Sequence, residues 1–157
     1  MAGLIDEFAG IVTKLNERGI EYAVCGGWAM AIHGFLRATL DIDFLIVTED
    51  VQRIFDVARE QGFDIEGLPL NFDGGKTQIR RISKIDQRSK ELITLDLLLV
   101  TEAYKDVWET RKRVIWNEGE YRVVSRKGME KMKEMAGRPK DLIDLDYLRG
   151  LDDEDDD

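Results

Sequence analysis

The chain has 157 residues, of which 43% are hydrophobic, and it carries a formal net charge of −9. This length is enough for a domain with a buried core. No apolar run approaches the roughly 18 residues of a membrane-spanning helix, and the first residues lack the basic start and long apolar centre of a signal peptide. The single cysteine, Cys25, excludes an intramolecular disulfide. We therefore expect a cytoplasmic protein that does not associate with a membrane.

The negative charge is concentrated at the C-terminal end. Residues 152–157 are all acidic, so the rest of the chain is only about three charges negative. We predict a single domain over residues 1–150 and a disordered acidic tail over 151–157; the alternative is a tail that occupies a basic groove. The body is not basic enough to indicate binding of long nucleic acid, although a local patch could bind a short RNA end.

Hydrophobic periodicity and turn residues predict a mixed α/β domain. The first half of the pattern predicts a helix over 4–15, a strand over 21–25, a helix over 28–35, a strand over 42–47 and a helix over 51–61. A loop over 67–76, which holds Pro69 and three glycines and could form a hairpin turn at Asp73-Gly74-Gly75, precedes an edge strand over 77–85, and the strongest strand pattern covers 91–100. The remainder predicts a helix over 102–109, a hairpin over 114–124, and two terminal helices over 127–136 and 141–148.

Two aspartates open the strand over 42–47, in the order Asp41-Ile42-Asp43-Phe44. Because side chains alternate along a strand, Asp41 and Asp43 lie on the same face. Two neighbouring carboxylates repel each other, so the pair indicates a bound cation. Mg²⁺ is favoured, with Mn²⁺ as the alternative, since hard divalent cations are held by one or two carboxylates together with substrate phosphates.

A pair of glycines, Gly26 and Gly27, lies between the strand over 21–25 and the helix over 28–35. Backbone N–H groups at a helix start can bind phosphate oxygens, and glycine lets a phosphate approach closely. A phosphate-binding turn so near a carboxylate pair points to nucleotide chemistry.

A third carboxylate, Asp96, sits in the middle of the apolar strand over 91–100. An aspartate in such surroundings costs free energy unless it has a partner. If this strand lies beside the strand of Asp41 and Asp43, two metal ions about 4 Å apart could bridge a triphosphate and an attacking hydroxyl. Asp96 could also act as a general base. The alternative is a structural Asp96 that hydrogen-bonds a turn or pairs with an arginine.

These motifs resemble a known family. The segment over 26–46, GGWAMAIHGFLRATLDIDFLI, is similar to the signature of the nucleotidyltransferase superfamily with the DNA polymerase β-like fold, and within it to a small G-G subgroup related to AbiEii-type toxins. The resemblance covers residues 22–100, and a weaker likeness extends over 132–145. It implies an α/β (α+β) minimal nucleotidyltransferase core, with a mixed sheet, helices packed mainly on one face, and C-terminal helices.

The resemblance places Asp41, Asp43 and Asp96 at the catalytic and metal-binding positions, and Gly26 and Gly27 at the triphosphate turn. Many members have a serine where this chain has Gly27, so only backbone donors remain here.

Other side chains have two interpretations each. Arg37 either neutralises a phosphate or is a surface arginine, and Thr39 either assists the nucleotide site or hydrogen-bonds its own loop. The resemblance implies that Lys133 and Arg138 reach the nucleotide. The lone His33 is interpreted as a packed or hydrogen-bonded residue.

A run of basic residues follows the predicted loop. Its charges either steer a polyanionic substrate or protect a strand edge. Its members are Arg80, Arg81, Lys84, Arg88 and Lys90.

The sequence thus predicts a metal-dependent nucleotidyltransferase that moves an NMP from an NTP to an acceptor hydroxyl and releases pyrophosphate. The acceptor could be a small molecule, an RNA end or a protein hydroxyl. The alternative is a nucleotide-binding protein or toxin–antitoxin component with the same fold and little catalytic activity. A D-x-D glycosyltransferase is less consistent with 157 residues, because such enzymes need a larger nucleotide-sugar domain.

Overall fold

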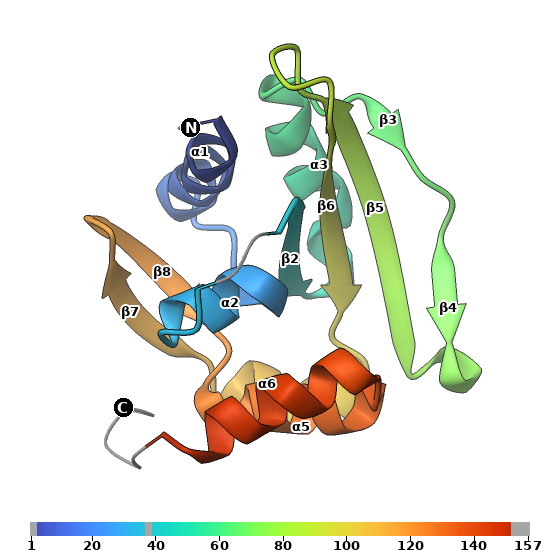
Figure 1. Cartoon of the computed structure of the whole chain (residues 1–157). Coiled ribbons are helices and arrows are strands. Elements are labelled where there is room, and N and C mark those ends of the chain that lie inside the picture. Colours follow the sequence, from blue (N-terminus) through green and yellow to red (C-terminus); the bar gives the residue numbers. More distant parts are fainter. Residues whose placement is uncertain (1–2, 37–38, 152–157) are drawn as a thin grey trace.

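The computed structural model describes residues 3–36 and 39–151. These residues form an eight-stranded sheet in the order β3-β5-β6-β2-β1-β8-β7, with β4 paired to β5 beside this path (Figure 1). The strands are β1 (Ala23–Cys25), β2 (Asp41–Ile46), β3 (Ile65–Glu66), β4 (Leu70–Phe72), β5 (Thr77–Ile85), β6 (Leu92–Leu99), β7 (Lys112–Trp116) and β8 (Gly119–Val123). The α-helices are α1 (Gly3–Glu17), α2 (Gly26–Ile32), α3 (Val51–Glu60), α4 (Lys105–Glu109), α5 (Arg126–Ala136) and α6 (Pro139–Arg149). Short 3-10 helices are η1 (Thr48–Asp50), η2 (Asp73–Gly75) and η3 (Glu102–Tyr104).

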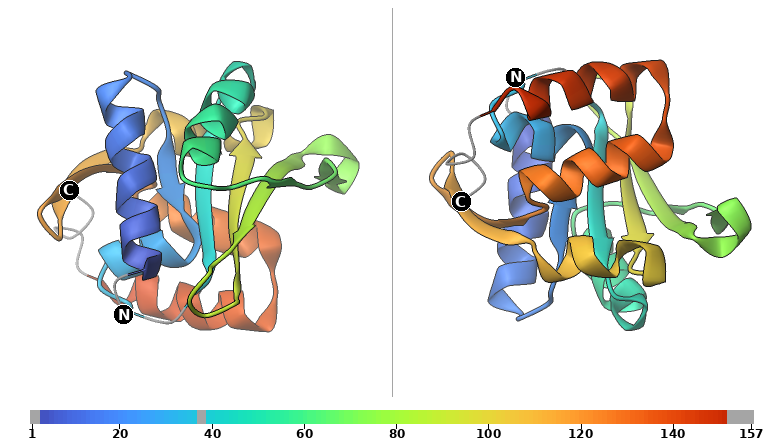
Figure 2. Two further views of the ribbon diagram at one scale, coloured as in Figure 1. Left: turned by 90° about the horizontal axis from the view of Figure 1, so that it is seen from above. Right: turned by 90° about the horizontal axis from the view of Figure 1, so that it is seen from below.

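The sheet is mixed, which confirms the expected fold class. The pairs β2–β6 and β1–β8 are parallel, whereas β1–β2, β5–β6 and β7–β8 are antiparallel. Helices lie on both sides of the sheet, rather than mainly on one face as the resemblance implies: α1 and α3 on one side, and α5 and α6 on the other (Figure 2). Helix α2 follows β1 directly and packs against β1 and β2.

The apolar core lies between α1, α3 and the sheet. Helical spacing puts Phe8, Ile11 and Leu15 on one face of α1, and all three are buried. The ring of Phe8 lies 6.3 Å from the ring of Phe44 on β2. Because Phe44 points into this core, its neighbour Asp43 points to the opposite face of the sheet.

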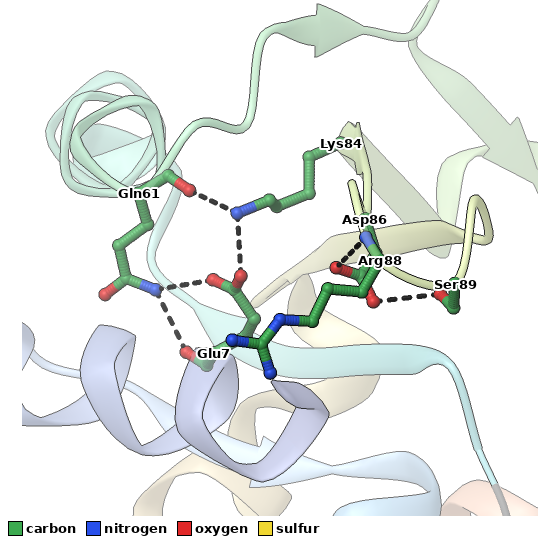
Figure 3. A network of polar contacts seen from close by, with 6 residues as sticks. All are labelled: Glu7, Gln61, Lys84, Asp86, Arg88 and Ser89. Carbon is green, nitrogen blue, oxygen red and sulfur yellow. Dashed lines mark hydrogen bonds and ion pairs between the residues drawn. The ribbon is translucent and has the colours of Figure 1, made fainter. Parts of the chain in front are cut away.

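A polar network ties α1 and the end of α3 to β5 (Figure 3). Lys84 Nζ donates hydrogen bonds to Glu7 Oε2 and to the Gln61 carbonyl, both at 2.6 Å. Gln61 Nε2 donates to the Glu7 carbonyl at 3.1 Å and to Glu7 Oε1 at 3.0 Å. Lys84 therefore has a structural role, which neither interpretation of the basic run had assigned to it.

The structure corrects the sequence prediction around residues 67–85. The segment predicted as a loop contains β4, but the hairpin turn predicted at Asp73-Gly74-Gly75 is confirmed, because η2 joins the antiparallel strands β4 and β5. The predicted edge strand, β5, is an interior strand that pairs with β6 on one side and with β3 and β4 on the other. The Gly- and Pro-rich composition concealed β4, because three residues of strand depend on their partner strand rather than on local preference. The other predicted helices and strands are confirmed, with boundaries shifted by a few residues.

Two predictions fall on parts of the chain that the structure does not describe. Arg37 lies outside the described residues, as does the predicted acidic tail beyond Leu151. Among the described helices, none combines the length and the apolar character needed to cross a membrane.

Candidate active site

Three carboxylates meet on the face of the sheet opposite α1. In the parallel pairing of β2 with β6, Asp43 stands directly opposite Asp96, and Asp41 stands opposite Thr94. The D-x-D spacing and the strand pairing together bring Asp41, Asp43 and Asp96 to one face, as the sequence predicts if these strands are neighbours.

Arg81 extends this row by one strand. It stands opposite Asp96 in the antiparallel pairing of β5 with β6. Its Nε donates to Asp96 Oδ1 at 2.7 Å and its second guanidinium nitrogen donates to Asp96 Oδ2 at 2.9 Å, a bidentate pair. This hydrogen bonding raises the pKa of Arg81 above its ordinary value. Asp96 is thus a member of the carboxylate row and the partner of an arginine, as the structural interpretation of this residue predicts, and its role as a catalytic or metal-binding residue stays a prediction.

Asp43 has an unusual protonation equilibrium. Loss of solvent contact, followed by the neighbouring carboxylates of Asp96 and Asp41, raises the pKa of Asp43 to about 7. Lys133 and Arg81 act in the opposite direction. Asp43 therefore lies in a negative field that the protein's own cations neutralise only in part, and a divalent cation would relieve this repulsion.

The glycine pair forms a close turn against Asp43. Gly26 has φ +64°, a left-handed conformation that favours glycine, and a Cβ atom at this position would overlap the Asp43 carboxylate. A Cβ atom at Gly27 would lie 3.1 Å from side-chain atoms of Thr39. Backbone N–H groups at the start of α2 are therefore held beside the carboxylate row, where any larger residue than glycine at position 26 would displace Asp43.

Thr39 acts on its own loop. Its hydroxyl accepts a hydrogen bond from the Asp41 N–H at 3.1 Å and lies 3.3 Å from the Asp41 carbonyl. This contact fixes the entry into β2. His33 is also hydrogen-bonded, through Nε2 to the Val124 carbonyl at 2.9 Å, which confirms its interpretation as a packed residue.

A buried ionic cluster joins α5 to α6. Lys133 is 8% exposed, and its Nζ lies 2.9 Å from Asp144 Oδ2 and 3.5 Å from Asp141 Oδ1. Arg138 Nε donates to Asp141 Oδ2 at 2.8 Å, and the Arg138 side chain is 58% exposed. Burial alone would raise the pKa of Asp141, but hydrogen bonds from the side chain and backbone of Arg138 outweigh it, and the pKa lies below its usual range.

One cleft of about 1440 Å³ is lined by the carboxylate row, Arg81, the glycine turn, Lys133 and Arg138. Of the residues predicted from sequence as catalytic or nucleotide-binding, every one that the structure describes lines this cleft: Gly26, Gly27, Thr39, Asp41, Asp43, Asp96, Lys133 and Arg138. The sheet register explains the convergence of the carboxylates, and the packing of α5 and α6 on the same side of the sheet explains why residues 133 and 138 join them.

The donor set suits Mg²⁺ or Mn²⁺. Asp41 and Asp43 offer hard carboxylate oxygens, and a cation there would offset the repulsion from Asp96 and Asp41 that, after burial, raises the pKa of Asp43. In the described part of the chain, no three His, Cys, Asp or Glu side chains are grouped so as to hold a metal ion by themselves. A site of two carboxylates completed by substrate phosphates needs no third protein ligand, and Arg81 already engages Asp96.

Sequence reasoning missed two features of this site. Arg81 was placed in a basic run with no individual partner, because the pairing of β5 with β6 that sets it opposite Asp96 is known only from the structure. The partners of Lys133 were missed because charged residues of an amphipathic helix ordinarily lie on its solvated face, yet Asp141 and Asp144 are both fully buried.

No family model matches this sequence, and no curated protein does. Solved structures do match. The lincosamide antibiotic adenylyltransferase LnuA, bound to lincomycin, has a TM-score of 0.59 at 11% identity, over 94% of this chain and 97% of that chain. ANT(2'')-Ia in complex with adenylyl-2''-tobramycin has a TM-score of 0.58 at 18% identity, over 88% of this chain and 83% of that one. An antigenic nucleotidyltransferase-like protein from Paracoccidioides brasiliensis has a TM-score of 0.57 at 17% identity, over 91% and 75%.

These neighbours share an architecture rather than a close sequence relationship with this protein. Their agreement with more than nine tenths of its length shows that they share its overall fold. This chain has the nucleotidyltransferase fold.

Proposed function

We propose that this protein is a metal-dependent nucleotidyltransferase that moves an NMP from an NTP to an acceptor hydroxyl and releases pyrophosphate. The single observation that carries the proposal is the register of Asp43 opposite Asp96, with Asp41 on the same face and the Gly26 turn against Asp43. Three carboxylates beside a backbone anion site match the needs of phosphoryl transfer, in which catalysis is positioning plus charge neutralisation.

Each residue has a distinct role in this proposal. The N–H groups after Gly26 bind the β- and γ-phosphates, while Asp41 and Asp43 hold Mg²⁺ or Mn²⁺. The bound ion would neutralise phosphate charge and lower the pKa of the acceptor hydroxyl. Asp96 faces the acceptor hydroxyl and accepts its proton, and Arg81 fixes the orientation of the Asp96 carboxylate.

Lys133 and Arg138 place N–H donors on the α5–α6 side of the cleft. Lys133 is held in place by Asp141 and Asp144, so its ammonium group enters the cleft from a fixed position. Arg138 is more exposed than Lys133, and its guanidinium N–H groups can donate hydrogen bonds to the triphosphate. Both therefore support binding of the pyrophosphate leaving group.

A direct test is transfer of label from an α-labelled NTP, with Mg²⁺ present, to RNA, protein and small-molecule acceptors. We expect Asp43→Asn to reduce transfer by at least about 10³-fold, because the ion that would neutralise the phosphates loses one of its two carboxylate ligands. Asp56→Asn is the control, since Asp56 is an exposed residue of α3 on the opposite face. Equal activity of Asp43→Asn and the unaltered protein would eliminate the proposed mechanism.

The second candidate function is a nucleotide-binding protein or toxin–antitoxin component, related to the AbiEii-type proteins, with little catalytic activity. The engagement of both Asp96 oxygens by Arg81 favours it, because this pairing reduces the availability of the third carboxylate. Calorimetry separates the two functions. An enzyme of the proposed kind gains NTP affinity when Mg²⁺ is added, whereas a non-catalytic module that binds nucleotide alone does not.

A further inference from the structure

The face of the sheet that carries Asp96 continues into an apolar surface. Ile79 lies two residues before Arg81 on β5, so the two side chains share one face of the sheet. Ile79 pairs with Leu70 on β4, and Phe72, two residues further on β4, stands opposite Thr77. We call the side chains of Leu70, Phe72 and Ile79 the ribbon wall.

The ribbon wall is open to the cleft. All three side chains line it, and Phe72 is 50% exposed, which is a large exposed apolar area for a residue beside a polar site. The β4–β5 ribbon projects sideways from the body of the sheet in both views of Figure 2. The wall therefore forms one side of the cleft beyond Asp96 rather than part of the core.

The position of the wall suits the acceptor. In an in-line displacement, the attacking hydroxyl and the leaving pyrophosphate lie on opposite sides of the phosphorus. The Gly26 turn adjoins Asp43 on the β1 side, so the acceptor approaches Asp96 from the β5 side. Ile79 lies two residues from Arg81, and two residues along a strand span about 7 Å. An acceptor whose hydroxyl lies at Asp96 can therefore contact Ile79 and Leu70 with the ring that is adjacent to this hydroxyl.

The charge of the wall selects among acceptors. Its three side chains are uncharged, and the adjacent Arg81 already pairs with Asp96. Of the acidic residues that line the cleft, Asp41, Asp43 and Asp96 form the carboxylate row, and Asp86 and Glu91 belong to the turn at the other end of β5 and β6, beyond the pair Ile85–Leu92. A polyamine acceptor would find no anionic partner at the wall, whereas an apolar ring or alkyl group would bury its surface there.

Building on the proposed function, we propose that the ribbon wall is the acceptor subsite and that it selects a hydroxyl compound bearing an apolar ring or alkyl group over a polyamine. Binding at the wall is measurable without turnover, so this inference can fail or succeed separately from the proposed transferase activity.

The experiment uses methyl and aromatic NMR signals of the full chain, saturated with Mg²⁺ and a non-hydrolysable ATP analogue and repeated without either. The two probes are lincomycin, which carries an alkyl-substituted ring, and tobramycin, a polyamine. We expect lincomycin to shift the signals of Leu70, Phe72 and Ile79 and tobramycin to leave them unchanged. Phe72→Ser should weaken lincomycin binding about tenfold, because the exposed ring no longer contributes apolar contact.

The matched control is Leu68→Ser, which removes an 84% exposed apolar residue of the same segment that does not line the cleft. It should leave lincomycin affinity unchanged, and both variants should keep the circular dichroism and ATP-analogue affinity of the unaltered chain. Absence of lincomycin-dependent shifts at the wall, or tighter binding of tobramycin there, overturns the inference. So does sedimentation showing a dimer that Phe72→Ser dissociates, because a second copy would then occupy the wall. If the unaltered chain does not bind the ATP analogue, the proposed function is refuted instead.

Discussion

Arg81 holds both carboxylate oxygens of Asp96 from the neighbouring strand, with N···O distances of 2.7 and 2.9 Å. Asp96 in turn stands opposite Asp43, so a cation of the protein and two carboxylates form one row across β5, β6 and β2. The row makes Arg81 a positioning residue for the proposed reaction, and it predicts how the site responds to substitution and to pH.

Replacement of Arg81 should change turnover more than nucleotide binding. Arg81→Lys keeps the charge but cannot reproduce the bidentate fork, so we expect kcat to fall about tenfold while KM for the NTP changes little. Arg80→Lys is the control, because Arg80 is the adjacent residue and points to the other face of β5. A parallel rise of KM in Arg81→Lys, with kcat unchanged, would assign Arg81 to nucleotide binding instead.

Stability should fall as the pH rises toward neutrality. The pKa of Asp43 is raised to about 7, so between about pH 4 and pH 7 the folded protein holds a proton that the unfolded chain releases. The free energy of unfolding, measured with urea, should therefore decrease across this range, by on the order of 2 kcal/mol.

Asp43→Asn should flatten this pH dependence, and Asp56→Asn should not. At pH 7, added Mg²⁺ should raise the unfolding free energy of the unaltered protein and of Asp56→Asn, since a ligand that binds only the folded state stabilises it. A pH profile that is the same with and without Asp43 would contradict the electrostatic account of the site.

Substitution of Gly26 should lower the free energy of unfolding by more than its left-handed backbone conformation alone explains. Gly26 and Gly19 have nearly the same φ, +64° and +66°, but a Cβ atom at Gly26 overlaps the Asp43 carboxylate, whereas no atom lies within 4 Å of one at Gly19. Gly19→Ala should destabilise by about 1 kcal/mol. Gly26→Ala should destabilise further and should also abolish NTP binding in calorimetry. Equal losses of stability in the two variants, with NTP binding retained, would show that the close contact between Gly26 and Asp43 has no role in the site.

Lys133 should contribute much more to stability than its exposed neighbour on α5. Lys133→Met leaves the buried carboxylates of Asp141 and Asp144 without their shared ammonium partner, and we expect a loss of about 3–5 kcal/mol in urea unfolding. Lys131→Met breaks only an exposed pair with Asp106 and should cost less than about 1 kcal/mol. Similar losses of stability in the two variants would show that the buried cluster stabilises the fold no more than an exposed ion pair does.

Local sequence patterns were sufficient for much of this fold. The helical spacing of Phe8, Ile11 and Leu15 predicts α1, and the apolar run around Asp96 predicts β6, because burial on one face imposes a period that can be read residue by residue. β4 could not be read in this way, since Leu70–Phe72 is extended only through its pairing with β5.

The sequence by itself determined which groups share a strand face: the alternation in Asp41-Ile42-Asp43 settles the direction of both carboxylates, whatever the rest of the chain does. Only the tertiary structure decided which strands are neighbours, and with it that Asp96 faces Asp43 and is held by Arg81. Strand order depends on contacts between residues far apart in sequence, and a period of two along one strand contains no information about the strand beside it.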